Sequence, residues 1–353
     1  DNKNSPINQT LDSGRVSFLR SIGDSVQNAF YPYATPDTFS VNAIMYKKID
    51  TLTNNIHDSI FVYSTNKDSA KYRLSFVDVG ANKGNYMPLL NGANGQVFQW
   101  IAPVNGVPQG EYEAAEFLVA PKMQQVVAVK GEYQLDSNTL IRTEVARSNF
   151  NNNTFGPKNP DHIGYAGKAE VINATKWKAK NEKQYTLTTD GSFEYESQNF
   201  QTIEPLRAVE FDRDWGLQII PTQASQKLGN ISFMLKDDKN NFANYQFATY
   251  LRGDGYRGFR NVIASKYGSK NGWNFDEDIR MTSISMPDNK GYYLTPTIDI
   301  SKTFSRLNNY TIGANYSAEI NNIKNISSDS VLATSYAFDI FSAYIKSYTA
   351  KKN

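Results

Sequence analysis

The feature that most constrains the fold is an alternation of apolar and polar residues between Tyr292 and Tyr348. Three stretches alternate in this way. Their apolar positions are Leu294, Pro296, Ile298, Ile300 and Phe304, then Tyr310, Ile312, Ala314, Tyr316, Ala318 and Ile320, then Leu332, Thr334, Tyr336, Phe338 and Ile340. Because successive side chains on a strand point to opposite faces, the pattern predicts three long antiparallel strands with one apolar and one polar face.

Two settings produce such a sheet. In a soluble sandwich the apolar face packs into a protein core. In an outer-membrane barrel it faces lipid, with aromatic residues near both interfaces and a polar inner face. The strand lengths favour the membrane setting, since soluble strands usually have ~5–6 residues and membrane-spanning strands ~9–11. Tyrosines near the strand ends also favour it, namely Tyr292, Tyr293, Tyr310, Tyr344 and Tyr348. The predicted lipid-facing residues are Ile298, Ile300, Tyr310, Ile312, Tyr316 and Ile320.

Composition agrees with an all-β chain and excludes several functions. The 353 residues include 22 Tyr and 20 Phe, and no apolar run is long enough for a membrane-spanning helix. The 37 basic residues nearly balance 35 acidic ones, so no basic field indicates a nucleic-acid partner. The absence of cysteine excludes disulfides and thiol chemistry, and two histidines are too few for a multi-histidine metal centre. We therefore predict an antiparallel up-and-down meander that is an outer-membrane-type β-barrel or part of one, with no metal or cofactor.

The chain divides into two regions by its pattern. Residues 1–120 are expected to hold shorter strands and a long Gly-rich loop between Gly84 and Glu113, preceded by a short helix within residues 15–30. Residues 121–353 are expected to hold the long-stranded meander. We predict that both regions belong to the same sheet or barrel.

Few residues suggest chemistry. Trp100 and Trp273, predicted in loops, could stack on a sugar, or pack under their own loops or at a membrane interface. Glu111 and Glu113 could bind a hard cation or act as acid and base, or be solvated loop charges. These four are the candidate ligand-binding residues, and no catalytic residue is predicted. A charged cluster is predicted to form an ion-pair ladder across neighbouring strands; it contains Glu204, Arg207, Glu210, Asp212 and Arg213.

Several phrases resemble a known group of proteins. They are Asn82-Lys83-Gly84-Asn85-Tyr86, the stretch from Trp100 to Glu113, Asn152-Asn153-Thr154-Phe155, and the stretch from Ile203 to Trp215. The chain from about Tyr63 onward resembles an internal segment of very large outer-membrane β-barrel proteins of Bacteroidota. Triplets such as Asp24-Ser25-Val26 and Asp329-Ser330-Val331 are similar to the O-glycosylation acceptor pattern of that phylum. The resemblance implies a bacterial outer-membrane location and carries no activity or site residue with it.

The expected function is non-enzymatic. We expect an outer-membrane protein that acts in transport, protein translocation or cell-surface assembly. Its partners would be outer-membrane lipid and other outer-membrane or surface proteins. The alternative is a soluble extracellular binding module, adhesin-like or glycan-binding, that uses the loop around Trp100. A glycoside hydrolase using Glu111 or Glu113 is a third hypothesis.

Overall fold

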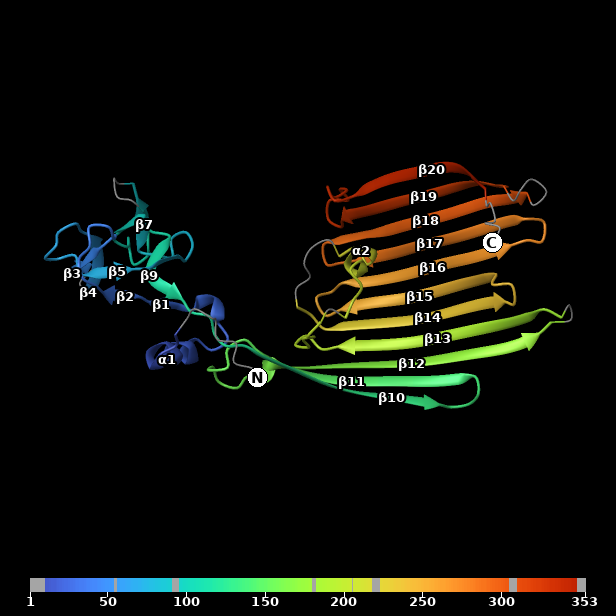
Figure 1. Cartoon of the computed structure of the whole chain (residues 1–353), viewed down its shortest axis with the longest axis horizontal. Coiled ribbons are helices and arrows are strands. Elements are labelled where there is room, and N and C mark those ends of the chain that lie inside the picture. The colour runs from blue at the N-terminus through green and yellow to red at the C-terminus, as the bar shows by residue number, and fades with distance from the viewer. Residues whose placement is uncertain are drawn as a thin grey trace, which may run out of the picture. The chain divides into compact units, whose positions relative to one another are not determined.

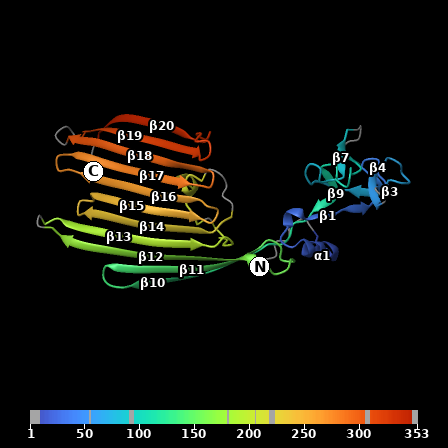
Figure 2. The ribbon, with the colours of Figure 1, turned by 180° about the vertical axis from the view of Figure 1, so that it is seen from behind.

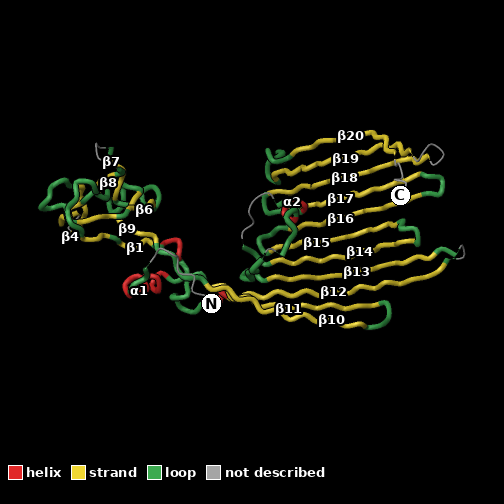
Figure 3. The backbone as a smooth tube through the Cα atoms, viewed as in Figure 1, coloured by secondary structure: helices red, strands yellow, loops and turns green. Residues whose placement is uncertain are grey.

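The computed structural model describes residues 10–53, 56–90, 95–179, 182–204, 206–217, 223–304 and 310–347. It is nearly all-β, with 60% of residues in strands and 6% in helices (Figure 3). The prediction of an all-β antiparallel meander is confirmed. The chain forms two compact units, one of Asp1–Met123 with Asn151–Asn159 and the other of Gln124–Phe150 with Pro160–Asn353.

The first unit holds two small antiparallel sheets. One has the order β1-β9-β7-β8 with β6 paired to β9, and the other has the order β2-β5-β3-β4. Their bounds are Phe30–Pro32 (β1), Ala34–Pro36 (β2), Tyr46–Thr53 (β3), Ile56–Tyr63 (β4), Tyr72–Leu74 (β5), Phe76–Asp78 (β6), Tyr86–Leu89 (β7), Val97–Trp100 (β8) and Tyr112–Phe117 (β9). The predicted loop from Gly84 to Glu113 thus contains strands. The described strands before Met123 pair only among themselves, which corrects the expectation of one shared sheet.

A short helix, α1 (Ser13–Ile22), packs in the same unit, with η1 (Val26–Asn28) after it. Asp12 caps its first turn, and Leu19 is fully buried against Ala29, Leu118 and Ala120. The buried Asn153 amide donates to the backbone carbonyls of Leu19 and Gly23, at 2.7 Å each, and so pairs groups that a helix end leaves open. None of the described helices has the length and apolar character needed to cross a membrane.

The second unit is an antiparallel sheet of eleven strands in chain order, β10 to β20 (Figures 1 and 2). The bounds are Met123–Gln134 (β10), Thr139–Asn151 (β11), Ile163–Lys178 (β12), Gln184–Glu196 (β13), Gln226–Asp237 (β14), Phe242–Arg252 (β15), Arg257–Gly268 (β16), Trp273–Ser285 (β17), Asn289–Phe304 (β18), Tyr310–Asn325 (β19) and Tyr336–Ser347 (β20), with η2 (Pro160–His162) before β12 and α2 (Phe211–Asp214) between β13 and β14. These strands have 11 to 16 residues.

The register confirms the predicted alternation in β18 and β19. Ile298 lies opposite Tyr316 and Ile300 opposite Ala314, so the two predicted apolar sets share one face. The prediction for the last strand was wrong: Phe341 lies opposite Tyr316, and Phe338 lies opposite Glu319 on the other face. Strand β20 is apolar on both faces, so alternation alone could not assign its sides.

The connections differ in length between the two ends of the sheet. At one end, on the right in Figure 1, all five connections have four or five residues; they are 135–138, 179–183, 238–241, 269–272 and 305–309. At the other end, residues 152–162, 197–225 and 326–335 make longer connections beside two short ones. The connections at one end of the sheet are therefore all short, and the other end, called the elaborated end below, carries the long ones.

The turn at 135–138 yields a pH prediction. One carboxylate oxygen of Asp136 accepts from the backbone N–H groups of Asn138 (2.7 Å) and Thr139 (2.9 Å). The hydrogen bond from Asn138 is the main cause that lowers the pKa of Asp136 below its ordinary 3.8, helped by the Thr139 hydroxyl. Because the folded pKa is depressed, the stabilisation is present above the unfolded pKa and is lost as pH falls through the folded value. We expect a carbon-detected NMR titration of this carboxyl to have its midpoint below 3.8, and Thr139→Ala to raise that midpoint. A midpoint at or above 3.8 would contradict the assignment.

Candidate functional site

The apolar face of the long-stranded sheet is the face that carries Ile298 and Tyr316. Directly opposed residues share a face, so the register extends this face from β11 to β20. Its exposed apolar side chains include Val145, Val171, Phe193, Ile231, Phe233, Leu235, Phe259, Ile263, Met281, Ile300, Phe304, Ile312, Phe341 and Ile345. Monomeric soluble proteins rarely expose apolar patches beyond a few hundred Å². A face of this kind requires an apolar environment.

Tyrosine and tryptophan lie on the apolar face near both ends of the strands. Near the short connections these are Trp177, Tyr185, Tyr267, Trp273 and Tyr310, and near the other end they are Tyr165, Tyr195 and Tyr292. Tyr165 and Trp177 are twelve residues apart on β12, which is roughly 40 Å along a strand at ~3.3 Å per residue. A strand tilted by ~35–45° would place these rings roughly 28–32 Å apart along the bilayer normal. That matches the ~30 Å thickness of a bilayer's hydrocarbon core.

Not every tyrosine predicted to lie near a strand end at the membrane interface is on the apolar face. Tyr293 and Tyr344 lie on the polar face, where they donate to Glu319 (2.7 Å) and Asp299 (2.8 Å). Tyr348 is outside the described residues. Adjacent tyrosines such as Tyr292 and Tyr293 must point to opposite faces of a strand. Counting neighbouring aromatic residues in the sequence therefore overestimates how many lie on the apolar face.

The six residues predicted to face lipid all lie on the apolar face. Tyr310, Ile300 and Ile312 are 43%, 47% and 50% exposed, and the other three, Ile298, Tyr316 and Ile320, are half-buried. Among polar side chains on this face, Lys302 lies over the ring of Trp273 at 4.7 Å, and Ser265 donates to Glu277 at 2.9 Å. A lysine near a strand end can place its ammonium at the headgroup level.

The polar face carries charged side chains on most strands. Arg142 on β11 pairs with Glu132 of β10 (2.8 Å) and Glu170 of β12 (3.4 Å). Further along the sheet, Arg280 on β17 pairs with Asp278 of the same strand at 2.6 Å. Side chains of this kind need water or fixed polar partners. The two faces of the same sheet therefore require different surroundings.

A covering segment, residues 197–204 and 206–217, folds back over the polar face near its elaborated end (Figure 1). Arg207 lies 2.5 Å from Glu194 and 2.8 Å from Glu196, both at the end of β13. The backbone at Phe200 passes so close to Gly164 that a Cβ there would lie 2.2 Å from it. The predicted ion-pair ladder across strands was wrong, because all five of its charged residues lie on this segment and none lies on a strand.

Trp215 anchors the segment. Its side chain is 3% exposed and packs with Tyr250 and Ile284 in the core of the second unit. A Cβ at Gly258 would lie 2.7 Å from its ring, so glycine is what lets the ring rest on the β16 backbone. The Tyr256 hydroxyl donates to the Trp215 carbonyl at 2.5 Å, and burial raises the pKa of this phenol, which keeps it a donor.

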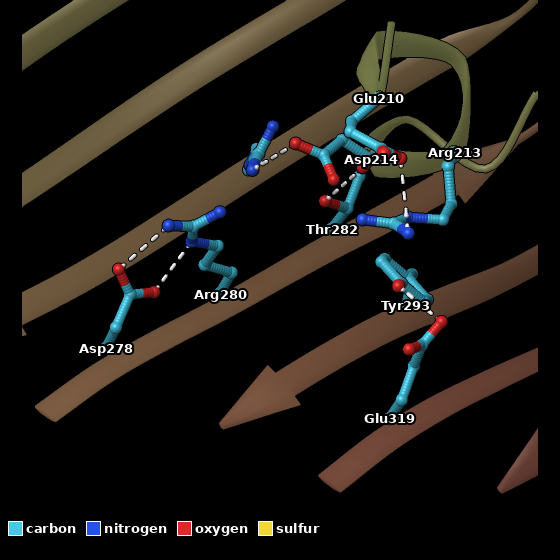
Figure 4. A network of polar contacts seen from close by, with 9 residues as sticks. Glu210, Arg213, Asp214, Asp278, Arg280, Thr282, Tyr293 and Glu319 are labelled. Carbon is cyan, nitrogen blue, oxygen red and sulfur yellow. Dashed lines mark hydrogen bonds and ion pairs between the residues drawn. The ribbon is translucent and has the colours of Figure 1, made fainter. Parts of the chain in front are cut away.

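Figure 4 shows the polar network around α2. The Thr282 hydroxyl of β17 donates to the Asp214 carbonyl, and the Asp214 carboxylate pairs with Arg260 of β16, both at 2.9 Å. Arg213 pairs with Glu210 at 3.1 Å. Side-chain and backbone groups of one residue, Asp214, thus join α2 to two neighbouring strands.

A cavity of about 590 Å³ lies between the covering segment and β10 to β13. Its small side chains come from the strands, at Ala128, Ala146 and Ala166, and Phe200 contributes from the segment. The charged lining residues are Glu144, Lys168, Glu194, Glu196, Glu204 and Arg207. This volume lies within the ~300–1,000 Å³ of small-molecule sites.

The candidate ligand-binding residues belong to both units. Trp100, Glu111 and Glu113 belong to the first unit and Trp273 to the second. Trp100 ends β8 and Trp273 begins β17, so neither lies in the predicted loop. Glu113 accepts from the backbone and side-chain nitrogens of Asn85 at 2.9 and 2.6 Å, while Glu111 is exposed. Among the described residues, no group of three or more His, Asp or Glu side chains is placed to hold a metal ion.

No protein-family model, curated protein or solved structure matches this chain.

Proposed function

We propose that the eleven-stranded sheet is part of the wall of a bacterial outer-membrane β-barrel, with its apolar face in lipid and its polar face toward a water-filled interior. One observation carries the proposal: exposed apolar side chains cover one face from β11 to β20, with tyrosine and tryptophan near both strand ends. The strand lengths and the resemblance to large outer-membrane proteins of Bacteroidota support it.

The unequal connections also support this proposal. Outer-membrane walls have short turns on the periplasmic side and longer loops outside. The end with the five short connections would then be periplasmic, and the covering segment would enter the interior from the cell-surface side. In lipid every backbone group needs a partner. Within the described residues β10 and β20 are the two ends of the strand order, so each would need a further strand beside it.

The role that follows is transport, protein translocation or surface assembly by a non-enzymatic protein. The polar face, its ion pairs and the cavity under the covering segment would line a polar path. The apolar residues Phe338 and Ile340 on the polar side of β20 would contact another protein element of the same assembly.

The proposal is tested by the behaviour of the full chain with and without lipid. We expect it to aggregate in buffer alone, to become monodisperse in detergent, and to stay with vesicles after an alkaline wash. Sedimentation and light scattering measure all three. A chain that is monodisperse without detergent and washes off vesicles would favour the soluble binding module instead.

A further inference from the structure

A second hollow, of about 430 Å³, lies on the polar face beside α2. Three strands supply most of its lining. The residues are the amides Asn230 and Gln246, the guanidinium groups of Arg260 and Arg280, and an apolar set of Phe211, Trp215, Leu228, Ala248 and Val262. Figure 4 shows Arg280 and the neighbouring α2 network. A pocket with an apolar wall and a few converging polar groups is the usual form of a small-molecule site.

The charged groups that line this hollow are both cationic. Arg260 and Arg280 each have a carboxylate partner, Asp214 and Asp278, but neither of these two aspartates lines the hollow. The cavity under the covering segment differs, since glutamates are among its lining residues. The hollow beside α2 therefore presents guanidinium and amide groups to whatever enters it.

Arg260 keeps one N–H group without a partner among the described residues. Its Nη2 pairs with Asp214 at 2.9 Å. Its Nε is buried and makes no hydrogen bond to any residue that the structure describes. A buried donor without a partner is unfavourable. Guanidinium groups favour carboxylate oxygens as hydrogen-bond acceptors, so the two arginines of the hollow suit a carboxylate ligand.

We propose that this hollow binds a small organic carboxylate with an apolar body. The carboxylate lies toward Arg260 and Arg280, and the apolar body lies against Phe211 and Val262. The inference rests on the proposed function, because a polar interior is the side from which such a solute would reach the site.

The test is a fluorine NMR titration of the full chain in detergent micelles with 4-fluorobenzoate, against a detergent-only blank. We expect saturable binding, weaker binding of the neutral 4-fluorobenzamide, and a loss of about tenfold in affinity for 4-fluorobenzoate in Arg280→Gln, as for one charged hydrogen bond. Arg280 is 46% exposed, which makes it a safer substitution than Arg260. The matched control is Arg142→Gln, which removes an arginine of similar exposure from the same face outside the hollow and should leave affinity unchanged.

Each contrary outcome overturns a defined part of the proposal. Equal affinity for the carboxylate and the amide would remove the role of charge. Unchanged affinity in Arg280→Gln, or an equal loss in Arg142→Gln, would remove the site. Displacement of 4-fluorobenzoate by inorganic phosphate at equal concentration would show that the apolar body contributes nothing. The titration needs no bilayer, so its failure leaves the lipid test of the wall unaffected, and the converse also holds.

Discussion

Arginine in place of Ile263 should lower the free energy of unfolding in a bilayer by roughly 2–4 kcal/mol. Ile263 is near the middle of β16 on the apolar face, between Tyr245 and Ile279, and its side chain is 46% exposed. A charged group there would sit in hydrocarbon. The measurement is equilibrium unfolding in urea of the chain reconstituted in lipid vesicles.

The matched control is the next residue. Ala264 lies on the polar face opposite Asn244 and Asp278, so Ala264→Arg should be nearly silent. The expected depth of a residue in the bilayer provides a second comparison. Ile312 is 50% exposed but lies only two residues into β19, so Ile312→Arg should cost roughly 0–1 kcal/mol, as expected near an interface. Equal costs at residues 263 and 312 would indicate a face packed against protein.

Cysteine substitutions can test the same two faces independently, because the chain contains no cysteine. In vesicles, Ile263→Cys should react with a bilayer-soluble thiol reagent and resist a water-soluble one. Ala264→Cys should show the reverse if the polar face meets water. If both reagents fail at residue 263 in the folded protein, the membrane-wall proposal is wrong for this strand.

The second large effect is expected at Trp215. Trp215→Ala should lower the free energy of unfolding by about 3–5 kcal/mol, since it removes a large buried side chain. The covering segment would lose its anchor, so trypsin should cleave faster at Arg207 and Arg213. Limited proteolysis with mass spectrometry measures this. Val209→Ala, at a residue 97% exposed in the same segment, should change neither quantity. Unchanged protection in Trp215→Ala would mean that the ion pairs of Arg207 and Asp214 hold the segment by themselves.

The sequence predicted what depends on local alternation. In β18 and β19 each apolar residue has a polar neighbour, and the predicted faces agree with the register. In β20, apolar residues such as Phe338 and Phe341 occur on both faces, so the pattern gave the wrong side. The short strands of the first unit were partly missed because β7 and β8 have only four residues each, too few to show a period.

The covering segment was not predicted because no hydrophobic period marks it. Its charged residues have no period, and partners such as Glu194 on the preceding strand β13 and Arg260 on β16 lie outside the segment. The sequence did contain signals of the segment. Glycines inside strand patterns, here Gly164 and Gly258, often mark a close approach by another backbone or ring. Trp215, a large aromatic residue directly after a charged run, was a further signal.

The anchoring of Trp215 has a consequence for the order of assembly. Each long strand pairs only with its neighbours in the chain, so the sheet can grow one strand at a time. Trp215 instead packs in one core with Tyr250, Tyr256, Ile284 and Ile323, which all follow it and extend to β19. Its docking site is therefore complete only when β19 has joined.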